Sequence, residues 1–126
     1  MAHISVVIPT RNERDNIVPL LDAVRSGLAA RSFEVWIVDD DSPDRTWEVA
    51  STYAKSHPEV FVIRRIGERG LSSAVVAGFI KSSGEVLAVM DADLSHDPAL
   101  LPQLIDAVDS GADIAVLHPF DDSGNI

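Results

Sequence analysis

The sequence contains no cysteine, and it has half as many basic residues as acidic ones. Without cysteine there can be neither a disulfide framework nor thiol chemistry. Ten Lys and Arg against 20 Asp and Glu give a net charge of −10, which argues against a nucleic-acid partner because such proteins present a basic face. No apolar run approaches the roughly 18 residues of a transmembrane helix. We therefore predict a soluble, cytoplasmic protein whose clustered carboxylates attract cations.

A glycine-rich phosphate loop is also missing. The first apolar run is followed by PTRNER rather than by G-x-G-x-x-G. The glycines of that motif let the backbone approach a pyrophosphate, so a hydride-transfer enzyme with a dinucleotide cofactor is not expected. The 126 residues, 46% of them hydrophobic, are sufficient for one compact domain with a core of its own.

Short apolar runs alternate with segments of helical periodicity along the whole chain. The runs predict strands at residues 4–9, 33–38, 60–63, 86–90 and 113–117. Strands of this kind, separated by helices, are typical of an α/β fold with a mainly parallel sheet and helices on both faces. The run at 86–90 is apolar throughout, and we expect it to be buried on both faces.

Several residues are predicted to begin, pack or end helices. Ser42 and Pro43 fit an N-cap and first helical position, with Asp44 in an acidic first turn. Leu71 is expected to point inward from the next helix, and Gly84 to lie just past its C-terminus. Asp97 before Pro98 is expected to cap the last helix. After the strand predicted at 113–117, residues 118–126 are expected to form a polar tail.

Two carboxylates follow the strand predicted at 86–90. Asp91 and Asp93 are two residues apart, so in an extended segment they project to the same side. Like charges so placed repel unless a cation lies between them. Oxygen ligands suit Mg²⁺ or Mn²⁺, which keep other positions for water and substrate phosphates. We interpret the pair as a metal site; the alternative is a plain polar turn.

Polar clusters stand at the ends of four predicted strands, in residues 10–13, 39–41, 64–65 and 91–93. In open α/β sheets, ligands bind beyond the carboxyl ends of the strands. Asp39 can accept hydrogen bonds from the N–H edge of a nucleobase. The spacing leaves open whether Asp39 and Asp40 do this or are strand-end charges, and helix capping accounts for Asp41 and Asp44.

Arginines near the next helix start are candidates for phosphate binding. Arg65 and Arg69 precede or adjoin the expected helix start at Gly70 and can add positive charge toward a phosphate. For Arg64 we expect an ordinary solvated arginine.

Four motifs, taken in order, resemble the inverting glycosyltransferases of family 2. They are IPTRNERDNI, VDDDSPDRTWE, GERGLSSAVVAGF and MDADLSHDP, and the resemblance runs from about Ile4 to Val116. Within that family the sequence is most similar to polyprenol (dolichyl) phosphate mannosyltransferases. The resemblance implies the GT-A fold and covers the front, donor-binding part of the family domain. We expect one nucleotide-sugar-binding domain over residues 1–126, with the acceptor half missing.

The same resemblance implies roles for particular residues. Pro9 and Glu13 would line the nucleoside pocket, beside Arg11, which stands where many relatives have tyrosine. Asp39 would contact the base. Asp91 and Asp93 would bind Mg²⁺ or Mn²⁺ on the diphosphate and thereby act in catalysis, with Ser95 beside them. The implied donor is GDP-mannose and the acceptor a polyprenyl phosphate at the cytoplasmic membrane face; homo-oligomerisation is left open.

One departure bears on activity. Pro119 stands where relatives carry an arginine that helps to hold the acceptor phosphate. We therefore expect this chain to bind donor and to transfer sugar poorly, and a nucleotide-sugar-binding module or truncated product is the alternative function. A phospho-acceptor receiver domain, which is also α/β, wants acidic residues after the first strand and a lysine after the fifth. The sequence has Thr10 and His118 there, so that class is set aside.

Overall fold

The computed structural model describes residues 3–92 and 101–109. Four strands are present in this part of the chain: β1 (Ile4–Thr10), β2 (Phe33–Asp39), β3 (Val60–Arg64) and β4 (Val86–Val89). Four helices accompany them: α1 (Ile17–Gly27), α2 (Thr46–Lys55), α3 (Leu71–Lys81) and α4 (Leu101–Asp109). The strand predicted at 113–117 and the helix start predicted at Asp97 lie outside the described residues.

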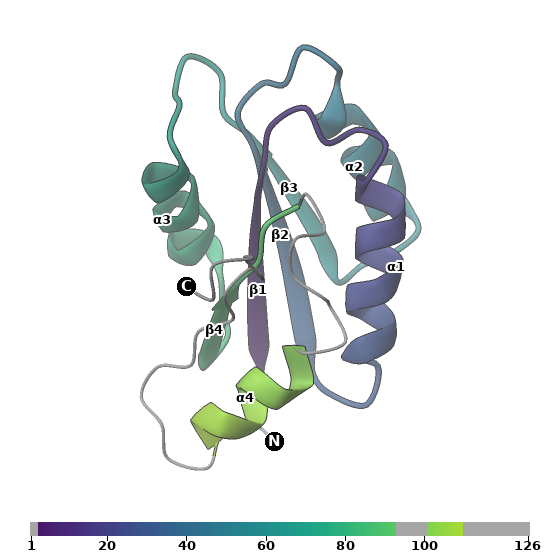
Figure 1. The fold of residues 1–126 in the computed structure, drawn as a ribbon, viewed down its shortest axis with the longest axis vertical. Helices are drawn as coiled ribbons and strands as arrows, with labels where there is room; N and C mark the ends of the chain where they lie inside the picture. The colour runs from purple at the N-terminus through teal and green to yellow at the C-terminus, as the bar shows by residue number, and fades with distance from the viewer. Residues whose placement is uncertain (1–2, 93–100, 110–126) are drawn as a thin grey trace, which may run out of the picture.

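The four strands form one parallel sheet in the order β3-β2-β1-β4. Parallel neighbours need a crossover connection, and each is supplied by a helix. Helix α3 covers one face of the sheet, while α1 and α2 cover the other (Figure 1). The prediction of an α/β fold with a parallel sheet and helices on both faces is confirmed.

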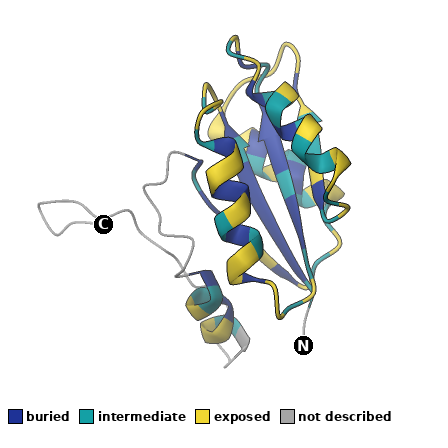
Figure 2. Ribbon diagram, turned by 90° about the vertical axis from the view of Figure 1, so that its right-hand side faces the viewer, coloured by how far each residue is buried: buried dark blue, intermediate teal, exposed yellow. Residues whose placement is uncertain are grey.

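The core has two parts because successive strand residues point to opposite faces. On the α1 side, Val6 and Ile8 of β1 are fully buried together with Leu20 of α1. On the α3 side, Val7 packs with Val38 and Ala74. Strands β1 and β2 are accordingly buried, whereas the outer surfaces of the helices are exposed (Figure 2).

Helix α3 lies very close to the sheet at Gly78. A β-carbon on Gly78 would lie 2.5 Å from Cγ1 of Val7, closer than real contacts allow. Glycine is therefore required at this position by close packing. Gly84 has a similar reason: its β-carbon would meet the Ser5 hydroxyl at 2.4 Å. The predicted role of Gly84 as a helix terminator is wrong, since the C-cap of α3 is Ser82.

Two expectations about burial are wrong. Leu87 and Val89 of β4 are 46% and 41% exposed, so the strand is not buried on both faces in the described part of the chain. Their side chains share the α3 face of the sheet, which α3 covers over β1 and β2. Leu71, expected to point inward, is 63% exposed; it is the first residue of α3.

The start of α2 also differs from expectation. The helix begins at Thr46, three residues later than predicted, after Arg45 in the left-handed region at φ 63°. The Ser42 hydroxyl donates to Asp39 instead of capping the helix. Asp44 does supply a cap, because its carboxylate accepts from the Thr46 amide at 3.0 Å.

The buried carboxylate of Glu34 joins β1, β2 and the residues that precede β4, at the end of the sheet where these strands begin. Glu34 of β2 accepts hydrogen bonds from the hydroxyl of Ser5, the indole of Trp36, and the amide and hydroxyl of Ser83. Burial raises the pKa of Glu34, but these donors outweigh it and lower the pKa to about 2. The network fixes the entry to β4 against β1 and β2.

We predict that Glu34→Gln lowers the free energy of unfolding at pH 7 by about 2–3 kcal/mol. Because the folded pKa of about 2 lies below the ordinary glutamate pKa of 4.5, the stabilisation is complete above pH 4.5 and is lost as pH falls toward 2. Urea unfolding of both proteins at pH 7, 4 and 3 checks this. The exposed Glu85→Gln is the control, and a wild-type advantage that does not shrink at acid pH would contradict the assignment.

Candidate functional site

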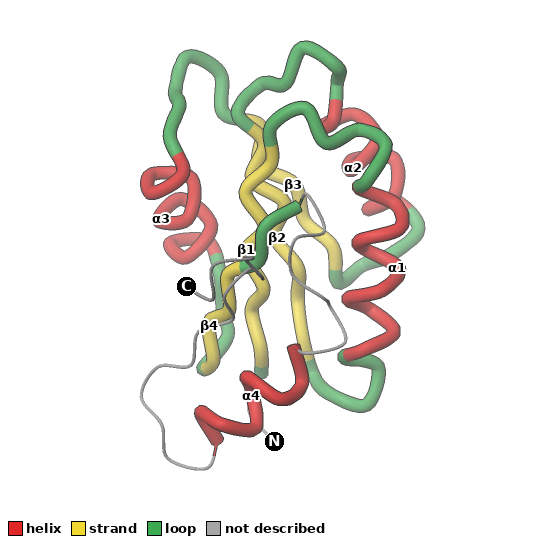
Figure 3. Tube along the Cα trace, viewed as in Figure 1, coloured by secondary structure: helices red, strands yellow, loops and turns green. Residues whose placement is uncertain are grey.

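The loops that follow β1, β2 and β3 gather at the same end of the sheet (Figure 3). Parallel strands place their carboxyl ends together, which is where open α/β sheets bind ligands. A cavity of about 390 Å³ opens there, within the usual size range of small-molecule sites. Its lining comes from the end of β1, the residue after β2 and the start of α3: Pro9, Thr10, Arg11, Asp40, Arg69, Gly70, Leu71 and Ala74.

The first two loops are locked together by hydrogen bonds. Three consecutive amides of the first loop donate to side chains of the second: Asn12 to Ser42, Glu13 to Thr46 and Arg14 to Asp44. Three residues of these loops, Asn12, Asp41 and Arg45, have positive φ of 54°, 50° and 63°. Non-glycine residues adopt this region at a cost, and they persist where surrounding contacts determine the backbone.

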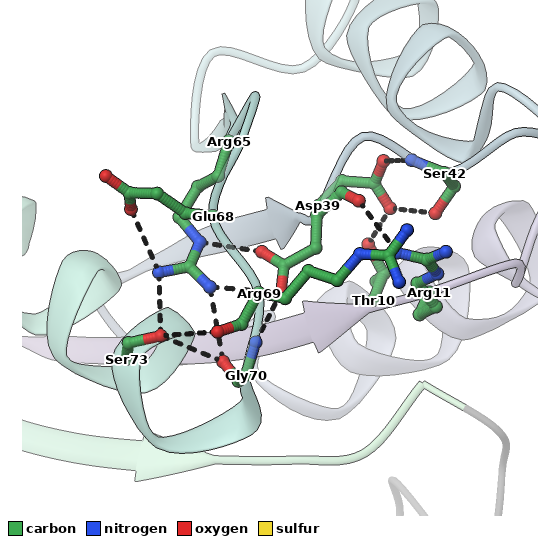
Figure 4. A network of polar contacts seen from close by, with 10 residues as sticks. Thr10, Arg11, Asp39, Ser42, Arg65, Glu68, Arg69, Gly70 and Ser73 are labelled. Atoms are coloured by element: carbon green, nitrogen blue, oxygen red, sulfur yellow. Dashed lines mark hydrogen bonds and ion pairs between the residues drawn. The ribbon is translucent and has the colours of Figure 1, made fainter.

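Asp39 lies beneath the cavity and does not line it. Its carboxylate is 0% exposed, and it accepts from the hydroxyls of Thr10 at 2.6 Å and Ser42 at 2.7 Å and from the Ser42 amide at 2.9 Å (Figure 4). It thereby ties the end of β1 to the loop after β2. A direct contact with a base would require Asp39 to exchange these partners; its predicted role stays a prediction.

Asp40 forms a bidentate ion pair with Arg65. The guanidinium donates through Nε and Nη2 to the two carboxylate oxygens, at 2.6 and 3.0 Å. Arg65 is only 6% exposed, and it also reaches Gly70 and Ser73 at the start of α3 (Figure 4). The hydrogen bonds from Arg65 to Asp40 raise the pKa of the guanidinium above its usual value. The charge of Arg65 is therefore held inside the protein.

The structure brings four of the predicted nucleotide-binding residues to the cavity: Pro9, Arg11, Asp40 and Arg69. Arg65 instead lines an adjoining hollow together with Arg69 and Asp40. The Glu13 carboxylate accepts a hydrogen bond from the side-chain amide of Asn16. Glu13 does not line this cavity. Asp93 and Ser95 lie outside the described residues.

Asp91 stands just after β4, at the same edge of the sheet. The register pairs Val89 with Val7, and the Met90 amide donates to the Val7 carbonyl. Continuing this register places Asp91 beside Pro9, which lines the cavity. The residues that the model describes contain no group of three or more His, Cys, Asp or Glu able to hold a metal ion.

Four of the lining residues, Thr10, Gly70, Leu71 and Ala74, were not predicted to bind a ligand, although Thr10 was placed in the polar cluster at residues 10–13 and Gly70 at the expected helix start. Thr10 could have been found, because parallel pairing of the first two strands sets it opposite Asp39. Leu71 could not, because it had been assigned to the core from its helical periodicity.

Asp41 and Arg64 have partners that the sequence did not indicate. They pair with each other at 2.7 Å, each more than a third exposed, and the Arg64 guanidinium lies 3.8 Å from the ring centroid of Trp47. Asp41 is therefore not a helix cap. Arg64 is partly solvated, as expected, but it is also held by two contacts.

Comparison with known families matches residues 5–126 to the model for glycosyl transferase family 2. The chain belongs to this family. Among curated relatives, the dolichol-phosphate mannosyltransferase of Pyrococcus furiosus is 51% identical over 90% of this chain and 32% of its own length. The polyprenol monophosphomannose synthase of Mycolicibacterium smegmatis is 42% identical over 88% of this chain and 43% of its own. The family 2 chain thus spans less than half the length of these relatives.

Solved structures agree on the fold. A mannosyltransferase from Pyrobaculum calidifontis, determined in complex with GDP-Man and Mn²⁺, superposes with a TM-score of 0.67 and 27% identity over 73% of this chain and 28% of that one. Glucosyl-3-phosphoglycerate synthase from Mycobacterium tuberculosis gives a TM-score of 0.70 over 85% of this chain and 39% of that one, at 22% identity. The second likeness shows the fold alone. These neighbours support the expected GT-A architecture for this family 2 chain.

None of the helices in the described ranges is long and apolar enough to cross a membrane.

We predict that Asp39→Asn lowers the free energy of unfolding by about 2–3 kcal/mol, because the new amide would set a donor against the buried donors of Thr10 and Ser42. Chemical denaturation measures the loss. Asp41→Asn, at a neighbouring but exposed carboxylate, should change stability by less than about 0.5 kcal/mol. Equal effects of the two substitutions would refute the structural role of Asp39.

Proposed function

We propose that this chain is the donor-binding part of a mannosyltransferase that transfers mannose from GDP-mannose to a polyprenyl phosphate. The observation that carries the proposal is the cavity of about 390 Å³ at the carboxyl edge, with Arg11 and Arg69 in its lining. Two arginines suit the negative charge of a nucleoside diphosphate. The relatives named for dolichol-phosphate and polyprenol mannose synthesis support the sugar and the acceptor, and the solved complex with GDP-Man supports the donor.

A divalent cation fits this edge if the substrate shares in holding it. Asp91 supplies a carboxylate beside Pro9, and Asp93 follows two residues later in the sequence. Mg²⁺ and Mn²⁺ are commonly bound by one or two carboxylates together with substrate phosphates and water. When bound, the cation would neutralise charge on the departing nucleoside diphosphate. The Mn²⁺ in the Pyrobaculum calidifontis complex supports a divalent ion in the family.

The residues of this chain would act by binding and orienting the donor. Arg11 follows β1 and Arg69 precedes α3, so two separate segments bring positive charge to the cavity. The base of the cavity (its floor) is held by the hydrogen bonds of the buried Asp39 with Thr10 and Ser42. A floor fixed by buried hydrogen bonds reduces the ordering that binding must impose, which favours affinity.

The reaction needs no general base from the protein. A phosphate monoester with a second pKa near 6 is largely ionised at neutral pH. One of its oxygens would attack the anomeric carbon in line, forming the new carbon–oxygen bond, while the bond to the diphosphate breaks and its electron pair leaves with the nucleoside diphosphate. In-line displacement inverts the configuration. A polyprenyl acceptor would place the reaction at a membrane surface, as the sequence predicted.

A second candidate function is nucleotide-sugar binding without transfer. It is favoured by one observation: the described cavity is built from strand ends β1 and β2 and the start of α3, all of which serve the proposed donor. Binding and transfer are therefore measured separately.

We expect the wild-type chain to bind GDP more tightly with Mn²⁺ than without it, by isothermal calorimetry. Asp91→Asn or Asp93→Asn should remove this dependence on Mn²⁺, because the carboxylate ligands of the ion are lost. Asp41→Asn is the matched control at the same edge, since that carboxylate is paired with Arg64. If Mn²⁺ promotes GDP binding equally in the Asp91 and Asp93 variants, the metal assignment is wrong.

The transfer step is tested with labelled GDP-mannose, Mn²⁺ and a short polyprenyl phosphate in detergent. We predict donor binding with little mannosyl product from this chain, because Pro119 offers no charge for the acceptor phosphate, and positioning of reactants can account for roughly 7–11 kcal/mol of a barrier. Robust product formation would show that residues 1–126 contain a working acceptor site.

A further inference from the structure

We propose that Arg65 and Asp40 are positioning residues, whose ion pair holds Gly70 and the neighbouring Arg69 at the cavity, while Arg65 itself makes no contact with the nucleotide. The inference rests on the proposed function and concerns how the cavity is kept in a binding geometry. It revises the sequence-based interpretation of Arg65, which placed this residue among those that bind the nucleotide sugar.

The hydrogen bonds of Arg65 leave it no donor for a ligand. A guanidinium has five N–H groups. Nε donates to one Asp40 oxygen, Nη2 donates to the other and to the Gly70 carbonyl, and Nη1 donates to Ser73 and Glu68. These five bonds match the five donors. Arg65 can therefore act on a bound nucleotide only through the residues that it holds.

Asp40 contacts both segments that line the cavity, the residues after β1 and the start of α3. Its Oδ2 accepts from the Gly70 amide at 3.1 Å as well as from Arg65, which fixes the residue that precedes α3. Its main-chain carbonyl accepts from the Arg11 guanidinium at 3.3 Å. The ion pair thus sets the position of Gly70, and the main chain of Asp40 separately holds the Arg11 side chain.

The segment that carries Arg69 has little else to hold it. Residues 66–70 are all exposed, whereas Arg65 is buried. The segment contains two glycines with positive φ, Gly67 at 80° and Gly70 at 125°, so its path is not one that ordinary residues favour. An exposed turn gains order from polar anchors, and Arg65 supplies two of them, at Glu68 and at the Gly70 carbonyl.

The first test compares two neighbouring arginines with the same substitution. Arg65→Lys keeps the charge but loses the fork geometry, so GDP affinity measured with Mn²⁺ should fall by about tenfold or more. Arg64→Lys alters an exposed pair and should change affinity by less than about twofold. Both are measured well below the unfolding temperature of each variant. Equal affinity of the Arg65 variant and the wild type overturns the proposal.

A double-mutant cycle separates positioning from a general loss of stability. If Arg65 acts partly through Arg69, then Arg65→Lys should weaken GDP binding clearly less in an Arg69→Ala background than in the wild type. A residue that only stabilises the fold would weaken binding by the same factor in both backgrounds. Equal factors would therefore exclude the positioning role.

Amide exchange followed by NMR tests the same pair without any nucleotide. Arg65→Lys should speed exchange at the Gly70 amide, which donates to Asp40, and leave the Gly84 amide unchanged, since that one donates to Ser5 at the other end of the sheet. If wild-type protein fails to bind GDP, the proposed function is refuted, but this measurement still tests whether the Arg65–Asp40 ion pair holds Gly70. Unchanged exchange at Gly70 refutes that role of the ion pair even where GDP binds.

Discussion

The carboxyl edge of the sheet depends on the burial of the Asp39 carboxylate. A fully buried anion is stable only when hydrogen-bond donors surround it. Here the donors come from Thr10 on β1 and from Ser42 in the loop after β2. Satisfying the charge therefore joins two strands and a loop at one point. The interlocked amides of the first loop add to this constraint, and the cavity forms above a floor that cannot easily shift.

Three consecutive aspartates show how strongly position decides the role of a residue. Asp39 is buried among hydroxyls, Asp40 is paired with a buried arginine beside the cavity, and Asp41 forms an exposed pair with Arg64. Of these three arrangements, the exposed ion pair of Asp41 is the one expected to contribute little to stability. The same chemical group thus serves as a structural tie, a link to the cavity wall and a surface charge.

The charge at the cavity is sorted in the same way. Arg65 and Arg69 are four residues apart, yet one is buried with five hydrogen bonds and the other lines the cavity. A buried arginine keeps its charge when it is paired, so Arg65 can organise a loop, while Arg69 stays available to an anion. This division fits the proposed function, in which a nucleotide-sugar donor would bring its negative charge to that edge.

The sequence by itself determined the fold class, the order of the elements and the edge at which the site lies. Apolar runs of strand length, alternating with helical periodicity, permit few arrangements other than a parallel sheet, and its strand ends carried the polar residues. Which of these residues face the cavity was decided only by the tertiary structure. Thr10 is 29 residues from Asp39 along the chain, so the sequence did not indicate their hydrogen bond. The ion pair of Arg65 with Asp40 likewise joins residues that follow different strands. Burial of Leu71 and Leu87 was misjudged for the same physical reason, because an apolar residue is buried only where a neighbouring element covers it.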